Sequence, residues 1–215
     1  MQQEDQSPGK EVLIEGLGGF LKIPEDANGI VLFAHGSGSS RYSTRNQYVA
    51  RMLNERGLGT LLMDLLTPEE ESVDLVTREL RFDIDLLARR VVLASEWLDQ
   101  NPETKTYGVG LFGSSTGAAA ALVAAAEVGP RIKAVVSRGG RPDLAAPVLP
   151  KVQSPTLLIV GGNDFTVIEM NKDAYELLQC EKRMEIVEGA THLFEEPGTL
   201  DEVAKLTRAW FVQHF

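Results

Sequence analysis

TYGVGLFGSSTGAAAALVAAAE, residues 106–127, contains the most informative junction in this chain of 215 residues. Its first seven residues form a β-rich apolar run, whereas its second half is rich in alanine and favours a helix. Between the two halves, GSSTG at residues 113–117 fits the pattern G-x-S-x-G. We therefore predict a strand at 106–112, a tight turn that carries Ser115, and a helix at 116–127.

Short apolar runs alternate with longer segments of helical period along the rest of the chain. This alternation is typical of a mostly parallel sheet with helices on both faces, so we predict an α/β fold with about eight strands. The first two runs are expected to pair antiparallel at one edge, and the acidic segment 67–80 to be a short amphipathic piece near the rim. Further strands are predicted at residues 11–16, 19–23, 29–34, 57–66, 132–137, 156–160 and 183–187, and helices at 44–56, 82–97, 166–180 and 199–213.

Composition indicates an ordinary globular protein with one core. Hydrophobic residues make up 43% of the chain and charged residues 24%, so we expect a single domain at residues 11–215 after a flexible polar tail at residues 1–10. The formal charge of −10 argues against nucleic acid and anionic membrane surfaces as partners, because both attract basic proteins. The predicted elements use nearly all of the length, so no separate lid domain is expected.

Cysteine usage and the first residues predict a cytoplasmic protein. Cys180 is the single cysteine, so no internal disulfide is expected, and residues 1–10 lack the apolar stretch of a signal peptide. The longest apolar stretch, residues 118–126, is well short of the roughly 20 residues that a membrane span needs. We expect no membrane association, and either a monomer or a homodimer.

A serine nucleophile needs a base, and three histidines are candidates. His214 is the penultimate residue and is expected to fray into solvent, and His35 follows a strand, where it is expected to shape a loop. His192 lies in GATHLFEEPG, directly after the last predicted strand, at the carboxyl edge of the sheet. We therefore predict His192 as the base for Ser115, the alternative being a loop histidine without a catalytic role.

The base needs a carboxylate that orients its ring, and Asp164 is the predicted partner. Asp164 directly follows the apolar strand in TLLIVGGND, and Ser115, Asp164 and His192 come in the chain order of α/β-hydrolases. Asp64 also ends a strand, but it precedes the serine. Asp164 also suits the N-cap of the next helix, and the two roles are compatible.

The oxyanion of a tetrahedral intermediate needs N–H donors that are already in place. In such a fold they come from the residue after the nucleophile, here Thr116, and from the loop after the first central strand. That loop is Gly36-Ser37-Gly38, and we predict the Ser37 N–H as the second donor. Gly36 is expected to line the substrate site, because ligands bind at the carboxyl ends of strands in open α/β sheets. The alternative is that HGSGSS is merely a flexible turn.

A competing motif overlaps the serine turn. Residues 108–113, GVGLFG, fit G-x-G-x-x-G, and Arg138 after the next strand would then be a partner for the 2′-phosphate of NADP. The first two glycines fall inside the predicted strand rather than in the turn after it, and several strands precede the motif. We therefore do not favour dinucleotide binding.

HGSGSSRYSTRN, GSSTG, GGND and THLFEEPG together resemble the dienelactone hydrolase-like branch of the α/β-hydrolase superfamily, over nearly the whole chain. The resemblance implies the α/β-hydrolase fold. Enzymes that hydrolyse dienelactones carry a cysteine nucleophile and a strand-end glutamate, whereas this chain has Ser115 and the sequence AHG at residues 34–36. We therefore expect serine chemistry on an ordinary ester.

Three arginines are predicted beside the loops that rim the site: Arg41 in GSSRYS, and Arg138 and Arg141 in SRGGRPDL. The resemblance makes a substrate carboxylate a plausible ligand for any of them, since an arginine can bind a carboxylate through two parallel hydrogen bonds. The alternative for each one is a surface arginine in a local salt bridge.

Together these residues predict a serine hydrolase that cleaves a small carboxylic ester, lactone or thioester through an acyl-enzyme, with a small-molecule substrate as its partner. Ser115 is the expected nucleophile, His192 the base and then acid, and Asp164 the orienting carboxylate. No metal and no organic cofactor is required. Transfer of the acyl group to an acceptor other than water stays open, and the alternative from another class is a catalytically silent α/β-hydrolase fold that serves as a binding or regulatory module.

Overall fold

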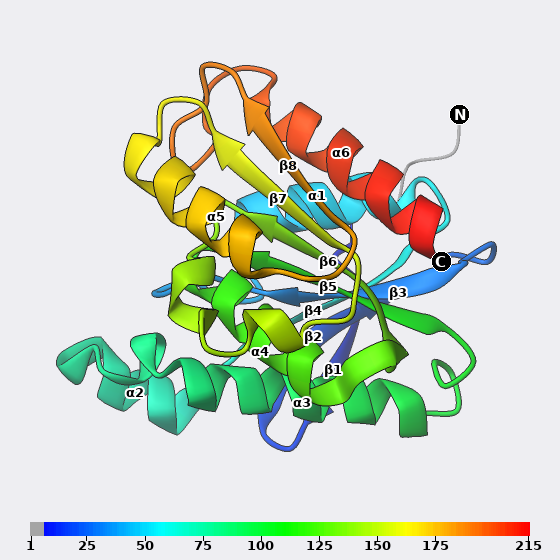
Figure 1. Ribbon diagram of the computed structural model, residues 1–215. Helices are drawn as coiled ribbons and strands as arrows, with labels where there is room; N and C mark the ends of the chain where they lie inside the picture. Colours follow the sequence, from blue (N-terminus) through cyan, green and yellow to red (C-terminus); the bar gives the residue numbers. More distant parts are fainter. Residues whose placement is uncertain (1–6) are drawn as a thin grey trace.

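The computed structural model describes residues 7–215, and its core is one eight-stranded sheet in the order β1-β2-β4-β3-β5-β6-β7-β8 (Figure 1). β1 and β2 pair antiparallel, and β2 also runs antiparallel to β4, whereas all neighbours from β4 to β8 are parallel. The predicted strand count, mostly parallel sheet and antiparallel edge are confirmed. The strands are β1 (Lys10–Ile14), β2 (Leu17–Lys22), β3 (Gly29–Ala34), β4 (Gly59–Met63), β5 (Gly108–Ser114), β6 (Ile132–Arg138), β7 (Thr156–Gly161) and β8 (Lys182–Val187).

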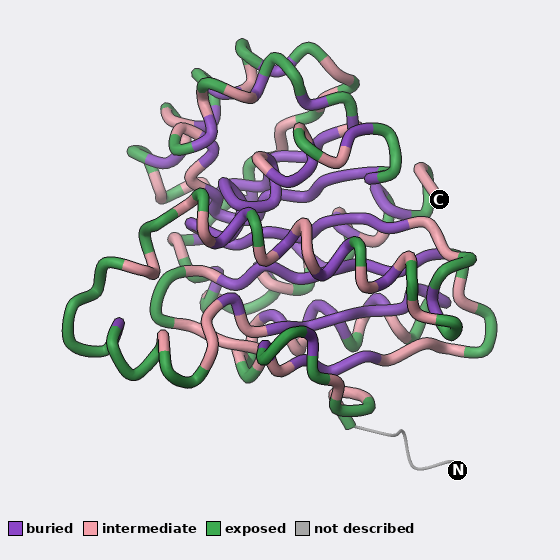
Figure 2. Tube along the Cα trace, turned by 90° about the horizontal axis from the view of Figure 1, so that it is seen from below, coloured by how far each residue is buried: buried purple, intermediate pink, exposed green. Residues whose placement is uncertain are grey.

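Helices cover both faces of the sheet (Figure 1). One apolar cluster contains residues from α3, α4 and α5, and the other contains residues from α1 and α6. Seen from below, the buried residues lie in the middle of the molecule, and most exposed residues lie around its outside (Figure 2). The helices are α1 (Thr44–Asn54), α2 (Pro68–Thr77), α3 (Ile84–Gln100), α4 (Thr116–Val128), α5 (Phe165–Leu177) and α6 (Thr199–His214).

The acidic segment 67–80 forms a regular helix, α2, for local reasons. The Thr67 side chain accepts a hydrogen bond from the Glu70 N–H, and the Glu70 carboxylate accepts one from the Thr67 N–H. This reciprocal capping and Pro68 at the first helical position are strong start signals, and three acidic residues in the first turn favour the positive end of the helix. The segment expected to be a short amphipathic piece is thus a helix, but it buries no apolar face, because Asp74 is its buried residue and Val73, Leu75 and Val76 are exposed.

Two expectations about the chain ends change. The tail expected at residues 1–10 lies for the most part outside the described residues, and β1 already begins at Lys10. His214, expected to fray, instead belongs to α6 and has a side chain only 11% exposed, because its ring packs edge-on against Trp210 at 4.6 Å between centroids. Within residues 7–215, no helix combines the length and apolar character that crossing a membrane requires.

The glycines of the G-x-G-x-x-G match have a packing role. Gly108 and Gly110 lie inside β5, and a Cβ atom on Gly110 would lie 2.5 Å from a ring carbon of the fully buried Phe211 in α6. The side chain of Phe211 therefore occupies the space above β5 that any residue larger than glycine would need. This contact explains the glycine at position 110 without a bound nucleotide.

The contact predicts that Gly110→Ala destabilises the protein by about 1–3 kcal/mol, because the buried Phe211 ring has little room to move. Urea unfolding followed by circular dichroism measures the change. Gly108→Ala is the matched control, since its added Cβ would first meet the flexible Lys133 side chain, at 3.1 Å. Equal stability of wild type and Gly110→Ala would contradict this explanation of the glycine.

Candidate active site

Ser115 stands in a strained turn between β5 and α4. Its backbone has φ 51° and ψ −122°, a combination that residues with a side chain rarely adopt. Its N–H donates to the Arg138 carbonyl at 3.3 Å, and its carbonyl accepts from the Arg141 N–H at 3.1 Å. Both backbone groups of the serine are thus held by the end of β6 and the chain that follows it.

The two flanking glycines make this turn possible. A Cβ on Gly113 would lie 2.3 Å from the Ala118 Cα, and one on Gly117 would lie 2.3 Å from the Ala34 carbonyl oxygen. Any side chain at either position would collide with backbone atoms. This is the reason for which the G-x-S-x-G motif requires glycine at both positions. Small residues in α4 let the helix pack this closely under the sheet.

His192 and Asp164 lie in contact on the loops after β8 and β7. His192 Nδ1 lies 2.7 Å from Asp164 Oδ2, and their side chains are 39% and 15% exposed. Asp164 occupies the N-cap position of α5, but its side chain makes no capping hydrogen bond. Two roles were predicted for Asp164. Its carboxylate contacts His192 and makes no hydrogen bond that caps α5.

The loop that carries His192 is held by Thr191 and Glu196. The Glu196 carboxylate accepts hydrogen bonds from the Thr191 hydroxyl at 2.6 Å and from the Thr191 N–H at 3.1 Å, and these bonds lower the pKa of Glu196. Phe194 is buried at φ 56°, and its N–H donates to the Thr191 carbonyl. The loop thus has a defined shape on both sides of His192.

A cavity of about 220 Å³ brings the predicted residues together. Ser115, His192, Ser37, Gly36 and Arg138 all line it, so four chain segments that are distant in sequence meet there. Its full lining is Gly36, Ser37, Ser39, Ser43, Arg45, Ser114, Ser115, Arg138, His192 and Leu193.

The loop after β3 lies directly beside the serine. A Cβ on Gly36 would lie 3.1 Å from the Ser115 Cβ, so this position has no room for a larger residue. Thr116 is the first residue of α4 and is buried, and Ser37 borders the cavity from the other side. The backbone N–H groups of a helix start carry partial positive charge, which suits a developing oxyanion.

His35 ties this loop to its neighbour and does not line the serine cavity. Its Nδ1 lies 2.9 Å from the Gly36 carbonyl oxygen, and its Nε2 accepts a hydrogen bond from the Leu65 N–H at 3.0 Å. These partners require a neutral ring with the proton on Nδ1. Burial lowers the pKa of His35 below the ordinary value of 6.5, in agreement with that form. The predicted role of His35 as a loop-shaping residue matches these contacts.

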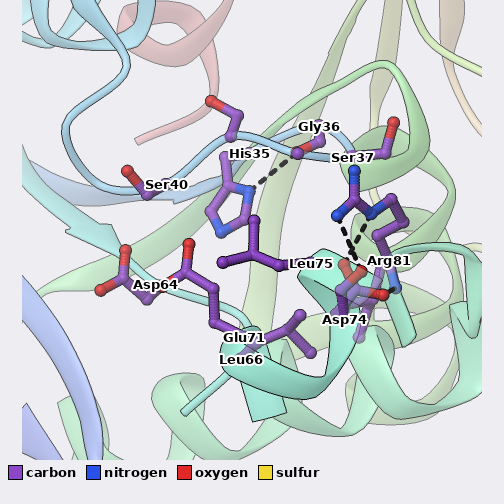
Figure 3. A pocket seen from close by; sticks show the side chains of 13 residues that line it. His35, Gly36, Ser37, Ser40, Asp64, Leu66, Glu71, Asp74, Leu75 and Arg81 are labelled. Carbon is purple, nitrogen blue, oxygen red and sulfur yellow. Dashed lines mark hydrogen bonds and ion pairs between the residues drawn. The ribbon is translucent and has the colours of Figure 1, made fainter. Parts of the chain in front are cut away.

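A second cavity, of about 100 Å³, is lined in part by the loop after β3 (Figure 3). Gly36, Ser37 and Ser39 line both cavities. In the second one, Asp74 of α2 faces Arg81, whose Nε donates to the carboxylate at 2.6 Å. Burial alone would raise the pKa of Asp74, but hydrogen bonds from Arg81 outweigh it and lower the pKa. Within residues 7–215, His, Cys, Asp and Glu form no group of three that could hold a metal ion.

The three predicted substrate-binding arginines separate in the structure. Arg41 forms a close ion pair with Asp64 and does not line the serine cavity. Arg141 binds Asp143 through two hydrogen bonds, of 2.9 and 2.8 Å, and does not line it either. For these two, the local salt bridge is what the structure contains, and Arg138 alone of the three faces the cavity.

The sequence analysis missed Arg45 and Ser43 at the start of α1, which also line the serine cavity. The sequence contains one signal for Arg45. Arg45 lies in the first helical turn, where acidic residues are favoured, and that turn contains no acidic residue. A cation at this end of a helix is unfavourable, and such a placement is a reason to look for a ligand.

Solved structures similar to this chain define its fold, and a family model defines its family. Est1E from Butyrivibrio proteoclasticus shares the fold, with a TM-score of 0.79 at 14% identity over 97% of this chain and 99% of that chain. The solved structure of a dienelactone hydrolase from Anabaena variabilis is 60% identical, with a TM-score of 0.93 over 96% of this chain and 97% of that chain. The model of the dienelactone hydrolase family matches residues 17–212. The chain has the α/β-hydrolase fold and belongs to the dienelactone hydrolase family.

Curated relatives from two strains of Mycobacterium tuberculosis carry a different name. Each is called "Putative phosphoribosyl transferase" and is 56% identical over 196 residues, which is 91% of this chain. The match covers 43% of each relative, so the chain spans less than half of their length.

The buried neutral His35 predicts a pH dependence of stability. As the pH falls below 6.5, the unfolded chain takes up a proton at this residue before the folded protein does, so the free energy of unfolding decreases. His35→Gln retains an acceptor for the Leu65 N–H but does not titrate. Urea unfolding at pH 7.5 and pH 5 should show a larger loss for wild type, by up to about 1.4 kcal/mol per pH unit. Equal losses in the two proteins would disprove the assignment.

Proposed function

We propose that the protein is a serine hydrolase that cleaves a small carboxylic ester through an acyl-enzyme on Ser115. The observation that carries this proposal is the 2.7 Å contact between His192 Nδ1 and Asp164 Oδ2 at the cavity that Ser115 lines. With Nδ1 donating its proton to Asp164, Nε2 is left with a lone pair, which is the form of histidine that accepts a proton from serine. Membership of a hydrolase family supports the same reaction type.

In the first half of the reaction, Ser115 Oγ attacks the ester carbonyl carbon while its proton passes to His192 Nε2. The Asp164 carboxylate stabilises the imidazolium that forms, and the N–H groups of Ser37 and Thr116 bind the oxyanion. The tetrahedral intermediate collapses when the carbon–oxygen bond to the alcohol breaks and His192 returns the proton to the leaving alcohol. The acyl group then remains on Ser115.

Water completes the cycle. It attacks the acyl carbonyl carbon and gives a proton to His192, and the bond to Ser115 Oγ then breaks as the serine regains that proton. The product is a carboxylic acid. The strained backbone of Ser115 supports this role, because such strain recurs where a side chain must be presented to a ligand.

The name of the mycobacterial relatives does not alter the proposal. It belongs to proteins more than twice as long as the matched segment, and the residues that support acyl chemistry lie within this chain. A silent binding module remains the alternative function, and turnover separates the two.

A fluorophosphonate probe should label the wild-type protein at Ser115, because the probe requires a serine that a base has activated. Mass spectrometry of the digested protein locates the adduct. Ser115→Ala should remain unlabelled, and Ser114→Ala, which changes the neighbouring serine, should still be labelled. A well-folded wild-type protein that takes up no probe would exclude the proposed nucleophile.

Asp164→Asn should lower kcat for 4-nitrophenyl acetate by roughly 10²–10⁴-fold, because the amide no longer stabilises the imidazolium or fixes the ring. Asp173→Asn, an exposed aspartate on the same helix α5, is the control and should retain full activity. Steady-state kinetics with circular dichroism on each variant makes the comparison. Turnover by wild type no faster than by Ser115→Ala would favour the silent binding module instead.

A further inference from the structure

Arg138 is a buried cation that has no anionic partner among residues 7–215. It ends β6, is 6% exposed, and lines the cavity that contains Ser115. Its Nη2 donates to Asn46 Oδ1 at 3.3 Å, its Cζ lies 5.7 Å from the Phe194 ring centre, and its Nε is buried without a hydrogen-bond partner. Among the described residues, no carboxylate forms an ion pair with it. An uncompensated buried charge is strongly unfavourable, so a ligand anion is the partner that this arrangement lacks.

A second cation faces the same cavity from the start of α1. Arg45 lies in the first turn of this helix, two residues after the N-cap residue Ser43, and both line the cavity. Its ion pair with Glu195, at 2.8 Å, involves a carboxylate that is 62% exposed, so water screens much of that attraction. The N-terminus of α1 adds its own partial positive charge.

Arg138 keeps its charge at neutral pH despite this environment. Burial, together with repulsion from Arg45, lowers the pKa of Arg138 from its ordinary value to about 10. The two guanidinium groups are thus close enough to interact, and Arg138 remains charged. One wall of the cavity therefore concentrates two cations and a helix N-terminus.

We propose that this wall, made of Arg138, Arg45 and Ser43, binds a phosphate group on the substrate. The inference rests on the proposed function and narrows its substrate class to carboxylic esters that also carry a phosphate. A helix N-terminus flanked by guanidinium groups is suited to phosphate, whose charge approaches −2 and whose oxygens accept several hydrogen bonds. A carboxylate has two acceptor oxygens instead of three and therefore offers fewer hydrogen bonds to the groups of this wall.

The size of the cavity limits the distance between the phosphate and the bond that breaks. Arg138 and Ser115 line the same space of about 220 Å³, and Ser114 pairs with Arg138 in the register of β5 and β6. The substrate is therefore a small phosphorylated ester with a short spacer between the phosphate and the ester carbonyl. The phosphate ester itself is not cleaved, because it serves as the anchor.

Isothermal calorimetry tests this site directly with inorganic phosphate. Ser115→Ala provides the background protein, so that binding is measured without turnover. Phosphate should bind to this protein more tightly than acetate at pH 7.5. Adding Arg138→Met should weaken phosphate binding by at least about tenfold, because hydrogen bonds to charged groups contribute about that much, and Arg45→Gln should also weaken it.

The matched control is Arg51→Gln, which removes one positive charge from the same helix near its other end. It should leave phosphate binding unchanged. Circular dichroism checks folding, and Arg45→Gln decides the question if Arg138→Met does not fold, since the Arg45 side chain is partly exposed.

Three results would overturn the proposal: no binding of phosphate, acetate binding as tight as phosphate binding, or phosphate binding that neither arginine substitution weakens. Fluorophosphonate labelling of wild type reports on the nucleophile separately. Labelling without phosphate binding would refute the anion site alone, and phosphate binding without labelling would refute the proposed hydrolase alone.

Discussion

The strained backbone of Ser115 is the constraint on which the rest of the site depends. A residue with a side chain at φ 51° persists only where its surroundings hold it. Here hydrogen bonds with the last residue of β6 and with the chain after it hold the N–H and the carbonyl of the serine. Gly113 and Gly117 let α4 approach β5 and the end of β3 to within backbone contact. The serine therefore stands at the carboxyl edge of the sheet because strand, helix and the neighbouring loop pack without side chains between them.

The loops around this turn are held by separate means. His35 connects the loop after β3 to the one after β4 through a neutral buried ring. Thr191 and Glu196 define the loop that carries His192, and Asp164 contacts that histidine from the loop after β7. These anchors surround a cavity that two like charges line, Arg45 and Arg138. Arg45 pairs with the exposed carboxylate of Glu195, whereas no carboxylate among residues 7–215 forms an ion pair with Arg138.

Sequence reasoning succeeded where the signal is local. The G-x-S-x-G turn, the parallel strands and the apolar periodicity of α3 follow from short-range sterics and from burial, which adjacent residues record directly. It failed for side chains whose partners no short pattern identifies. By sequence Arg41, Arg138 and Arg141 are equal candidates, whereas the structure pairs Arg41 with Asp64, 23 positions away, and Arg141 with Asp143, two positions away.

The amino-acid sequence by itself determined the α/β class, the strand order along the chain, and the set of chemically capable residues, since these depend on periodicity, turn chemistry and residue type. The tertiary structure alone decided which of those residues meet. It joined Asp164 to His192 instead of using it as a helix cap, packed His214 against Trp210, and left Arg138 buried without a counter-charge. The contacts of Asp164 with His192 and of Asn46 with Arg138 join residues 28 and 92 positions apart. No local pattern records these two contacts, because they form only when the sheet brings its strand ends to one edge.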